Sequence, residues 1–239
     1  MLGLGTSPIS THTKIWHPTD VAGLELWLVP QSQYFSLSGT AIDAWKAKYG
    51  KEAAYSYAQT TAAQRPTWDA TNKKVVADGS NDNLVEASNA ITIDTSATGW
   101  TIAIVCTSSD WDAANQSFLG DKDGNNDFFR HDSSAQTLSI KNDGQTRTIT
   151  LDTPAALVND QFYHIMATIQ TNGDFTMYID NVAQTDTESF TDTKDFEIDQ
   201  IIGKAGASQT LDGAIKSIMV FKEALKAEDR KGCYEYMTQ

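Results

Sequence analysis

The chain has 239 residues, of which 40% are hydrophobic and 21% are charged, and its formal net charge is −13. This balance is typical of a globular protein and excludes a disordered chain, and the acidic charge argues against a nucleic-acid partner, because neutralising phosphates requires clustered Lys and Arg. No apolar run reaches the roughly 18 residues of a membrane span, so membrane insertion is not expected.

Residues 1–20 contain Gly, Ser, Thr and Pro with little periodicity, which predicts an arm or linker ahead of one domain at 21–239. The arm has no basic n-region and too short an apolar stretch for a secretory signal, so export by that route is not expected. Its apolar side chains could anchor the protein to another component or pack back on the domain. These candidate assembly anchors are Leu2, Leu4, Ile9 and Trp16.

The first half of the domain shows strand signals of two kinds. Residues 24–28 alternate Leu with Glu or Trp before Pro30, which predicts a strand. Residues 41–49 are compatible with a short helix, but we favour a strand ending in a turn, and 60–83 predict a loop with one or two brief strands. The run WTIAIVC at 100–106 is almost continuously apolar, as expected of a strand buried on both faces.

Short strands continue through the second half. They are predicted at 117–119, 127–131, 137–141, 146–151, 196–203 and 213–221. Between them, FYHIMATIQTNGDFTMYIDNVAQ at 162–184 predicts three strands joined by two tight turns, a two-residue turn at Asn172-Gly173 and a second, weaker turn signal at Asp180-Asn181. A helix beginning near Ala227 is expected to cap the edge of the sandwich.

Strands at this spacing predict an all-β fold, an antiparallel β-sandwich or jelly roll with an N-terminal arm and a short C-terminal helix, rather than βαβ units. The two cysteines, Cys106 and Cys233, do not make a disulfide framework. We expect two buried free thiols, with a disulfide between them as the alternative.

Three segments together resemble the laminin-G-like, concanavalin A-like jelly roll. Residues 162–184 resemble its W-x-H-V-A-V-T, turn, L-Y-V-D-G pattern, 201–229 resemble its I-G, F-x-G-x-I-D-E-V-R-I-Y ending, and RPTWDATNKKVVADGSNDNL resembles its R-P-x-F and F-D-G-x-D-D-Y-L segment. The resemblance covers about residues 22–236 and implies that fold. The chain departs from the pattern at Lys216-Ser217, where many relatives carry an acidic pair, and at Asn181, which replaces the usual turn Gly.

The family includes glucanases, so the resemblance raises the question of catalytic carboxylates. Retaining glycosidases of this architecture use E-x-D-x-x-E on one strand, and Glu197 and Asp199 begin that pattern. Ile202 stands at its third position and cannot donate a proton to a leaving group. The four histidines lie in no triad context, and His164, at the family's strand His, is expected to be packed and hydrogen-bonded. We therefore expect no catalytic residues and no enzyme.

A polar loop is a candidate metal site. In the segment DKDGNND, Asp121, Asp123 and Asp127 concentrate the oxygen ligands that Ca²⁺ prefers. The resemblance implies Ca²⁺ at a loop rim, and a simple polar turn is the alternative. No other cofactor is expected.

One of the six tryptophans is a candidate ligand-binding residue. Four tryptophans lie in or beside predicted strands and are expected in the core: Trp27, Trp45, Trp68 and Trp100. Trp111 lies between polar residues in a predicted loop, which favours an exposed contact for a sugar ring. The alternative is a Trp folded back over the sandwich edge.

The sequence is compatible with two functions. The opening MLGLGTS and the linker into GLELWL resemble the starts of small virion proteins of tailed bacteriophages. That resemblance implies a virion-surface protein, a capsid decoration or fibre-associated protein made in the host cytoplasm, which binds other virion proteins and could form oligomers. The alternative is a lectin-like module that binds a host-surface glycan or receptor, with Ca²⁺ as an aid.

Overall fold

The structure is a computed structural model, and it describes residues 15–50, 55–86, 88, 91–93, 99–113, 115–124, 126–191, 195–205 and 209–239. The earlier strands are β1 Leu24–Leu28, β2 Phe35–Ser38, β3 Ala41–Lys46, β4 Tyr49–Gly50, β5 Ser56–Ala58, β6 Thr67–Asp69, β7 Lys74–Asp78, β8 Leu84–Val85, β9 Ile91–Ile93 and β10 Trp100–Ser108. The later strands are β11 Gln116–Gly120, β12 Phe128–His131, β13 Thr137–Asn142, β14 Gln145–Thr150, β15 Tyr163–Ile169, β16 Asp174–Ile179, β17 Val182–Ala183, β18 Glu188–Ser189, β19 Phe196–Ile198, β20 Gln200–Ile201 and β21 Asp212–Phe221. The helices are η1 Pro18–Asp20, η2 Ser32–Tyr34, η3 Ala62–Gln64 and α1 Ala227–Met237. The predicted all-β sandwich with one short C-terminal helix is confirmed.

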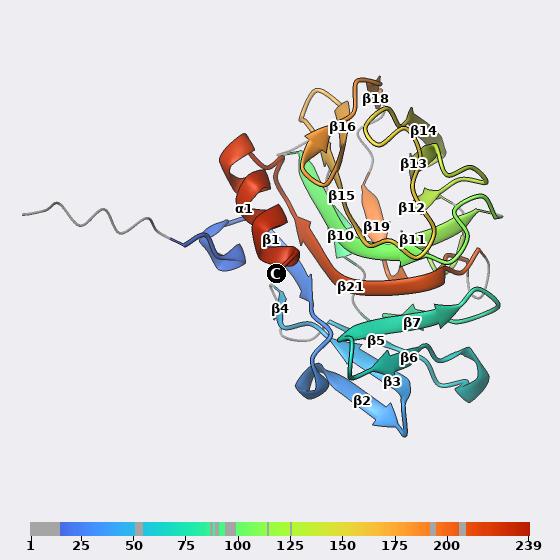
Figure 1. Cartoon of the computed structure of the whole chain (residues 1–239). Coiled ribbons are helices and arrows are strands. Elements are labelled where there is room, and N and C mark those ends of the chain that lie inside the picture. Colours follow the sequence, from blue (N-terminus) through green and yellow to red (C-terminus); the bar gives the residue numbers. More distant parts are fainter. Residues whose placement is uncertain are drawn as a thin grey trace, which may run out of the picture.

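Antiparallel pairing arranges the strands in two layers (Figure 1). One layer runs β16, β15, β10, β21, and the other runs β2, β3, β5, β8, β20, β11, β12, β13, β14. Strand β7 extends the first layer by pairing with β21, and β6 joins the two layers, because it pairs with β7 and with β3. The main hydrophobic core lies between the two layers and includes side chains from both.

Strand β21 has two different partners along one edge. Its residues 212–215 pair with β7 and its residues 218–221 pair with β1, while β10 follows the whole opposite edge. Lys216 and Ser217 therefore lie at a gap between β7 and β1. On the β10 side, Val105 pairs with Ser217 and Cys106 with Ile215, so Lys216 is the extra residue of a β-bulge. Bulges bend a strand and redirect a side chain.

Strand β10 is buried along its whole length, as predicted, but its two faces pack against different elements. Ile102 and Ile104 point into the core between the layers. Ala103 and Val105 belong to a second cluster, which also contains Cys233 of α1. The helix therefore covers the outer face of this layer, beside β1 and β15 in Figure 1, and the prediction that it caps the sandwich edge is wrong.

The segment 162–184 forms β15, β16 and β17, as predicted, but its two turns differ from expectation. Asp180 and Asn181 have φ of 48° and 65°, so this is the two-residue turn with positive φ at both positions. At Asn172-Gly173 only Gly173 has positive φ, within a longer loop, and a Cβ there would lie 2.0 Å from the carbonyl oxygen of Phe190. The prediction of a two-residue turn at Asn172-Gly173 is therefore wrong.

The two cysteines are both free and fully buried, Cys106 in the core and Cys233 on the buried face of α1. Burial raises the pKa of both thiols well above the usual range, which makes them unreactive packing residues. Among the described residues, no helix is long and apolar enough to cross a membrane.

Candidate functional site

Tyr49 is the exposed aromatic ring of the described chain. It is 42% exposed, whereas the other Trp, Tyr and Phe residues in the described segments are buried or half-buried. It lies on β4 directly opposite Trp27 of β1, and side chains of such antiparallel pairs stand on the same face about 5 Å apart. An exposed ring beside a pocket can stack on a ligand that the pocket holds.

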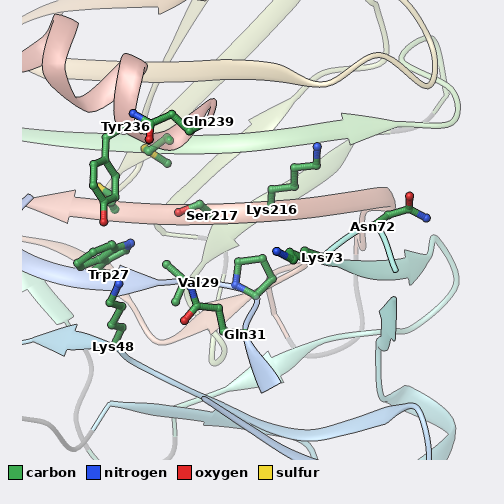
Figure 2. A pocket seen from close by; sticks show the side chains of 13 residues that line it. Trp27, Val29, Gln31, Lys48, Asn72, Lys73, Lys216, Ser217, Tyr236 and Gln239 are labelled. Carbon is green, nitrogen blue, oxygen red and sulfur yellow. The ribbon is translucent and has the colours of Figure 1, made fainter. Parts of the chain in front are cut away.

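That pocket, which we call the lysine pocket, lies where β1, β21 and the end of α1 meet, and its volume is about 330 Å³. This is within the roughly 300–1,000 Å³ of small-ligand sites. Figure 2 shows its main residues, with Tyr236, Trp27 and Lys48 grouped at one end and Lys73 and Lys216 at the other. Among the described residues, no Asp or Glu side chain lines it.

Trp27 forms one wall of the lysine pocket and is already covered by protein groups. The Nζ of Lys48 lies 3.8 Å from its ring centroid, and the rings of Tyr236 and His17 meet it edge-on, each with 5.5 Å between centroids. These contacts leave no free face on which a sugar could stack. The Nε1 of Trp27 is buried and has no hydrogen-bond partner within the described segments.

The three lysines of the pocket are placed by irregular backbone. Lys216 is the bulge residue of β21, and Lys73, in the turn before β7, has φ of 49°. A positive φ is uncommon for a residue other than Gly. Lys48 precedes β4, and its backbone N–H donates to the carbonyl oxygen of Trp27 at 2.9 Å. Burial lowers the pKa of Lys48, because its ammonium group is partly removed from water.

Carboxylates gather elsewhere, in the predicted calcium loop. Oxygens of Asp121, Asp123 and Asp199 lie within 4.8 Å of one another, and we call these three residues the acidic cluster. Lys122 lies among them. Its Nζ is 2.6 Å from Asp199 Oδ2 and 3.3 Å from Asp123 Oδ2, and its backbone N–H donates to Asp199 Oδ1 at 2.6 Å.

The Lys122 ammonium is therefore the counter-charge of the acidic cluster. Its hydrogen bond to Asp199 raises the pKa of Lys122, while burial raises the pKa of Asp199 and is partly offset by the lysine. Lys122 thus supplies a positive charge at the position where Ca²⁺ would supply one. We therefore propose no metal site at these carboxylates.

Asp127 does not join the acidic cluster, contrary to the predicted ligand set. It is buried, and its two oxygens accept hydrogen bonds from the backbone N–H groups of Asp143 and Glu197, at 2.8 and 3.3 Å. Burial raises its pKa to about 6. Its role is to hold two neighbouring segments together.

Trp111 is fully buried, so the prediction of an exposed contact is wrong and the alternative, a Trp folded back into the sandwich, is the observed arrangement. Its Nε1 donates to the carbonyl oxygen of Val158 at 3.1 Å, and its ring packs against His131 with 5.0 Å between centroids. The polar neighbours Asp110 and Asp112 form a local turn, which lets the indole point inward.

Trp16 of the arm packs on its own domain. Its Nε1 donates to Asp229 Oδ1 at 3.1 Å, its ring meets Tyr236, and a Cβ on Gly232 would lie 2.3 Å from its Cγ. Trp16 is therefore not a free anchor. The other predicted anchors, Leu2, Leu4 and Ile9, lie outside the described residues.

His164 is packed, as predicted, but its ring is not hydrogen-bonded within the described chain. Both ring nitrogens are buried without a partner, and the ring meets Tyr234 of α1 with 5.4 Å between centroids. Burial lowers its pKa to about 4, so the ring is neutral near neutral pH.

Tyr49 and the lysine pocket were not predicted from the sequence. The available signal was the departure at Lys216-Ser217, where the family pattern expects carboxylates. Lys48 and Lys73 are far from this pair in sequence, and they reach it only because β4 and β7 lie near β21 in the fold.

Comparison with known proteins gives a family match. The model of the concanavalin A-like lectin/glucanases superfamily matches residues 78–229. No curated protein sequence matches the chain.

Solved structures are similar in fold. A Trypanosoma rangeli sialidase in complex with sialic acid is similar at a TM-score of 0.58 and 12% identity, over 90% of this chain and 33% of that chain. The structure of HCR/D-Sa-GBL1/C is similar at a TM-score of 0.61 and 11% identity, over 90% of this chain and 52% of that chain. The Ruminococcus gnavus IT-sialidase CBM40 bound to α2,3-sialyllactose has a TM-score of 0.46 and 13% identity, over 59% of this chain and 84% of that chain. The chain spans about a third of the sialidase chain, and at such identities the likeness shows the fold alone.

Proposed function

Because the chain belongs to the concanavalin A-like lectin/glucanases superfamily, we propose that it is a non-enzymatic, lectin-like module that binds a saccharide. The observation that carries this proposal is Tyr49, an exposed ring across the β1–β4 pair from Trp27 of the lysine pocket. An aromatic ring with a polar tip gives a large contact area to a partly hydrated ligand, and the pocket beside it supplies polar groups.

The composition of the pocket supports binding over catalysis. Glycoside hydrolysis uses a pair of carboxyl groups, and no Asp or Glu side chain of the described chain lines the lysine pocket. The carboxylates that begin a hydrolase-like pattern lie elsewhere. Both oxygens of Asp199 are engaged by Lys122, which disfavours that residue as a nucleophile.

The test is a glycan array that spans neutral, sulfated and carboxylated oligosaccharides, followed by calorimetry with the best ligand. We expect Tyr49→Ala to lower the affinity about tenfold without changing the unfolding midpoint, because the ring is exposed and stacks only on the ligand. The matched control is Leu37→Ala, which truncates an exposed apolar side chain on β2. Full affinity in Tyr49→Ala, or release of reducing ends from the bound glycan, would contradict the proposal.

A second candidate is a virion-surface protein, a capsid decoration or fibre-associated protein that is attached through its arm. It is supported by Ile15, which is 86% exposed where the arm meets the domain. Since Trp16 belongs to the domain, the test removes only residues 1–14. We expect the truncated protein to fold but not to cosediment with particles that lack the native protein, and retained cosedimentation would count against an arm-mediated attachment.

A further inference from the structure

We propose that the lysine pocket binds a tetrahedral oxyanion, a sulfate or phosphate ester carried by the saccharide. The saccharide part of this inference rests on the proposed function, whereas the anion part rests on the pocket alone.

The charge of the lysine pocket favours an anion. Lys48, Lys73 and Lys216 line one pocket, and none of them forms an ion pair with a described carboxylate. In a chain with a net charge of −13, three cations have gathered where no described acidic side chain answers them. Neighbouring like charges repel one another, and a bound anion removes that repulsion.

The backbone geometry of the lysine pocket also supports a ligand site. The three lysines come from three elements: the segment before β4, the turn before β7 and the bulge of β21. Lys216 is redirected by its bulge, and Lys73 holds a φ of 49° that Gly or Asn would adopt more easily. Strained or irregular backbone at a ligand site is retained when it places a functional side chain.

A hydrogen-bond donor in the pocket wall, the indole N–H of Trp27, also supports an anion site. Trp27 is 2% exposed, and its Nε1–H has no acceptor within the described residues. Figure 2 shows this nitrogen on the side of the ring that faces the other pocket residues. A buried N–H without a partner is costly, and an anion oxygen in the pocket would satisfy it.

The kind of anion follows from the donors. A planar carboxylate is matched by the fork of an arginine, and no arginine of the described chain lines the pocket. Lysines act as separate point charges, and Figure 2 shows Lys48 at one end of the pocket and Lys73 and Lys216 at the other, which suits an anion that accepts hydrogen bonds on more than one side. The pocket volume of about 330 Å³ leaves room beside the anion for the sugar that carries it, close to Tyr49.

The experiment follows the indole N–H signal of Trp27 by NMR while inorganic sulfate, inorganic phosphate or acetate is added to the full chain at constant ionic strength. We expect a saturable shift with sulfate and phosphate and an affinity for acetate at least several-fold weaker. Lys216→Gln and Lys48→Gln should each lower the affinity for sulfate about tenfold. Lys73→Gln, at an exposed turn, gives a third variant if either of these fails to fold.

The matched control is Lys226→Gln, which makes the same charge change at an exposed residue preceding α1, outside the pocket. It should bind sulfate like the wild type. The proposal is overturned if chloride produces the same shift, if acetate binds as tightly as sulfate, or if Lys226→Gln weakens binding as much as the pocket variants do.

The source of the anion is settled with one sugar in three forms: galactose, galactose 6-sulfate and galactose 6-phosphate. Tighter binding of either ester than of the matching inorganic ion identifies the ester. If inorganic sulfate binds but Tyr49→Ala has no effect on any glycan, the saccharide proposal fails and the anion site stands. If neutral glycans bind through Tyr49 and sulfate does not bind, the anion inference fails alone.

Discussion

The acidic cluster and the lysine pocket are two concentrations of like charge that the protein treats in opposite ways. In the acidic cluster, the Lys122 ammonium lies 3.3 Å from an Asp123 oxygen and 2.6 Å from an Asp199 oxygen, so part of the negative charge is balanced within the chain. In the lysine pocket, no described carboxylate pairs with the cations, and the ammonium groups of Lys48 and Lys216 lie over the rings of Trp27 and Phe162, 3.8 and 4.2 Å from the ring centroids. The difference teaches that a cluster of charged residues points to a ligand only where the chain leaves its charge unpaired.

The largest expected effect on stability comes from breaking the ion pair between Lys122 and Asp199. Lys122→Met leaves Asp199, which is 1% exposed, as a buried carboxylate without its ammonium partner. We expect the free energy of unfolding to fall by about 3 kcal/mol, measured by urea denaturation. Lys226→Met, at an exposed lysine, should change it by less than about 0.5 kcal/mol. Equal losses of unfolding free energy in both variants would mean that the ion pair between Lys122 and Asp199 does not stabilise the fold.

A change of pH should act, with somewhat smaller effects, on two buried groups that lie outside the acidic cluster and the lysine pocket. His164, beneath α1, has a folded pKa of about 4, below its unfolded value, so its stabilising contribution is lost as the pH falls through the window from about 6.5 to 4. Asp127 has a folded pKa of about 6, above its unfolded value, so protonation stabilises the fold as the pH falls from about 6 to 4.

Between pH 7 and pH 5, these contributions are about 2 kcal/mol lost at His164 and about 1 kcal/mol gained at Asp127. His164→Phe should therefore lose less stability on acidification than the wild type, and Asp127→Asn should lose more. The measurement is the free energy of unfolding of each variant at both pH values. A pH dependence unchanged in both variants would show that neither group titrates as described.

The smallest expected effect on stability concerns a residue of the lysine pocket. Lys73→Gly should raise the free energy of unfolding by about 1 kcal/mol, because Gly adopts the positive φ without strain, and should also weaken sulfate binding. The matched control is Thr71→Gly, at an exposed residue of the same turn outside the pocket lining, which removes no charge. A loss of stability in Lys73→Gly, or unchanged sulfate affinity, would show that this backbone strain serves no ligand.

Much of the fold could be predicted from the sequence, because strand periodicity is a local property. The run WTIAIVC indicated two buried faces, and both are buried, but the helix that covers one of them comes from the other end of the chain. Turn geometry was less predictable. Asn172-Gly173 is the stronger dipeptide signal, yet the close approach of the Phe190 carbonyl decides its conformation.

The site was less predictable than the fold, because its residues are brought together only by strand pairing. Trp111 has polar neighbours in sequence and is buried, whereas Tyr49 lies among ordinary strand residues and is exposed. Asp121 and Asp123 did come together as predicted, but with Asp199 rather than Asp127, and with a lysine as their cation.

The gap between β7 and β1 along β21 has a consequence for how the protein could evolve. The lysine pocket opens where two strands end, and its charged side chains do not belong to either hydrophobic cluster. Substitutions at positions 48, 73 and 216 can therefore change the charge and shape of the pocket at little cost in stability. Related proteins could take up different ligands at this gap while keeping the same sandwich.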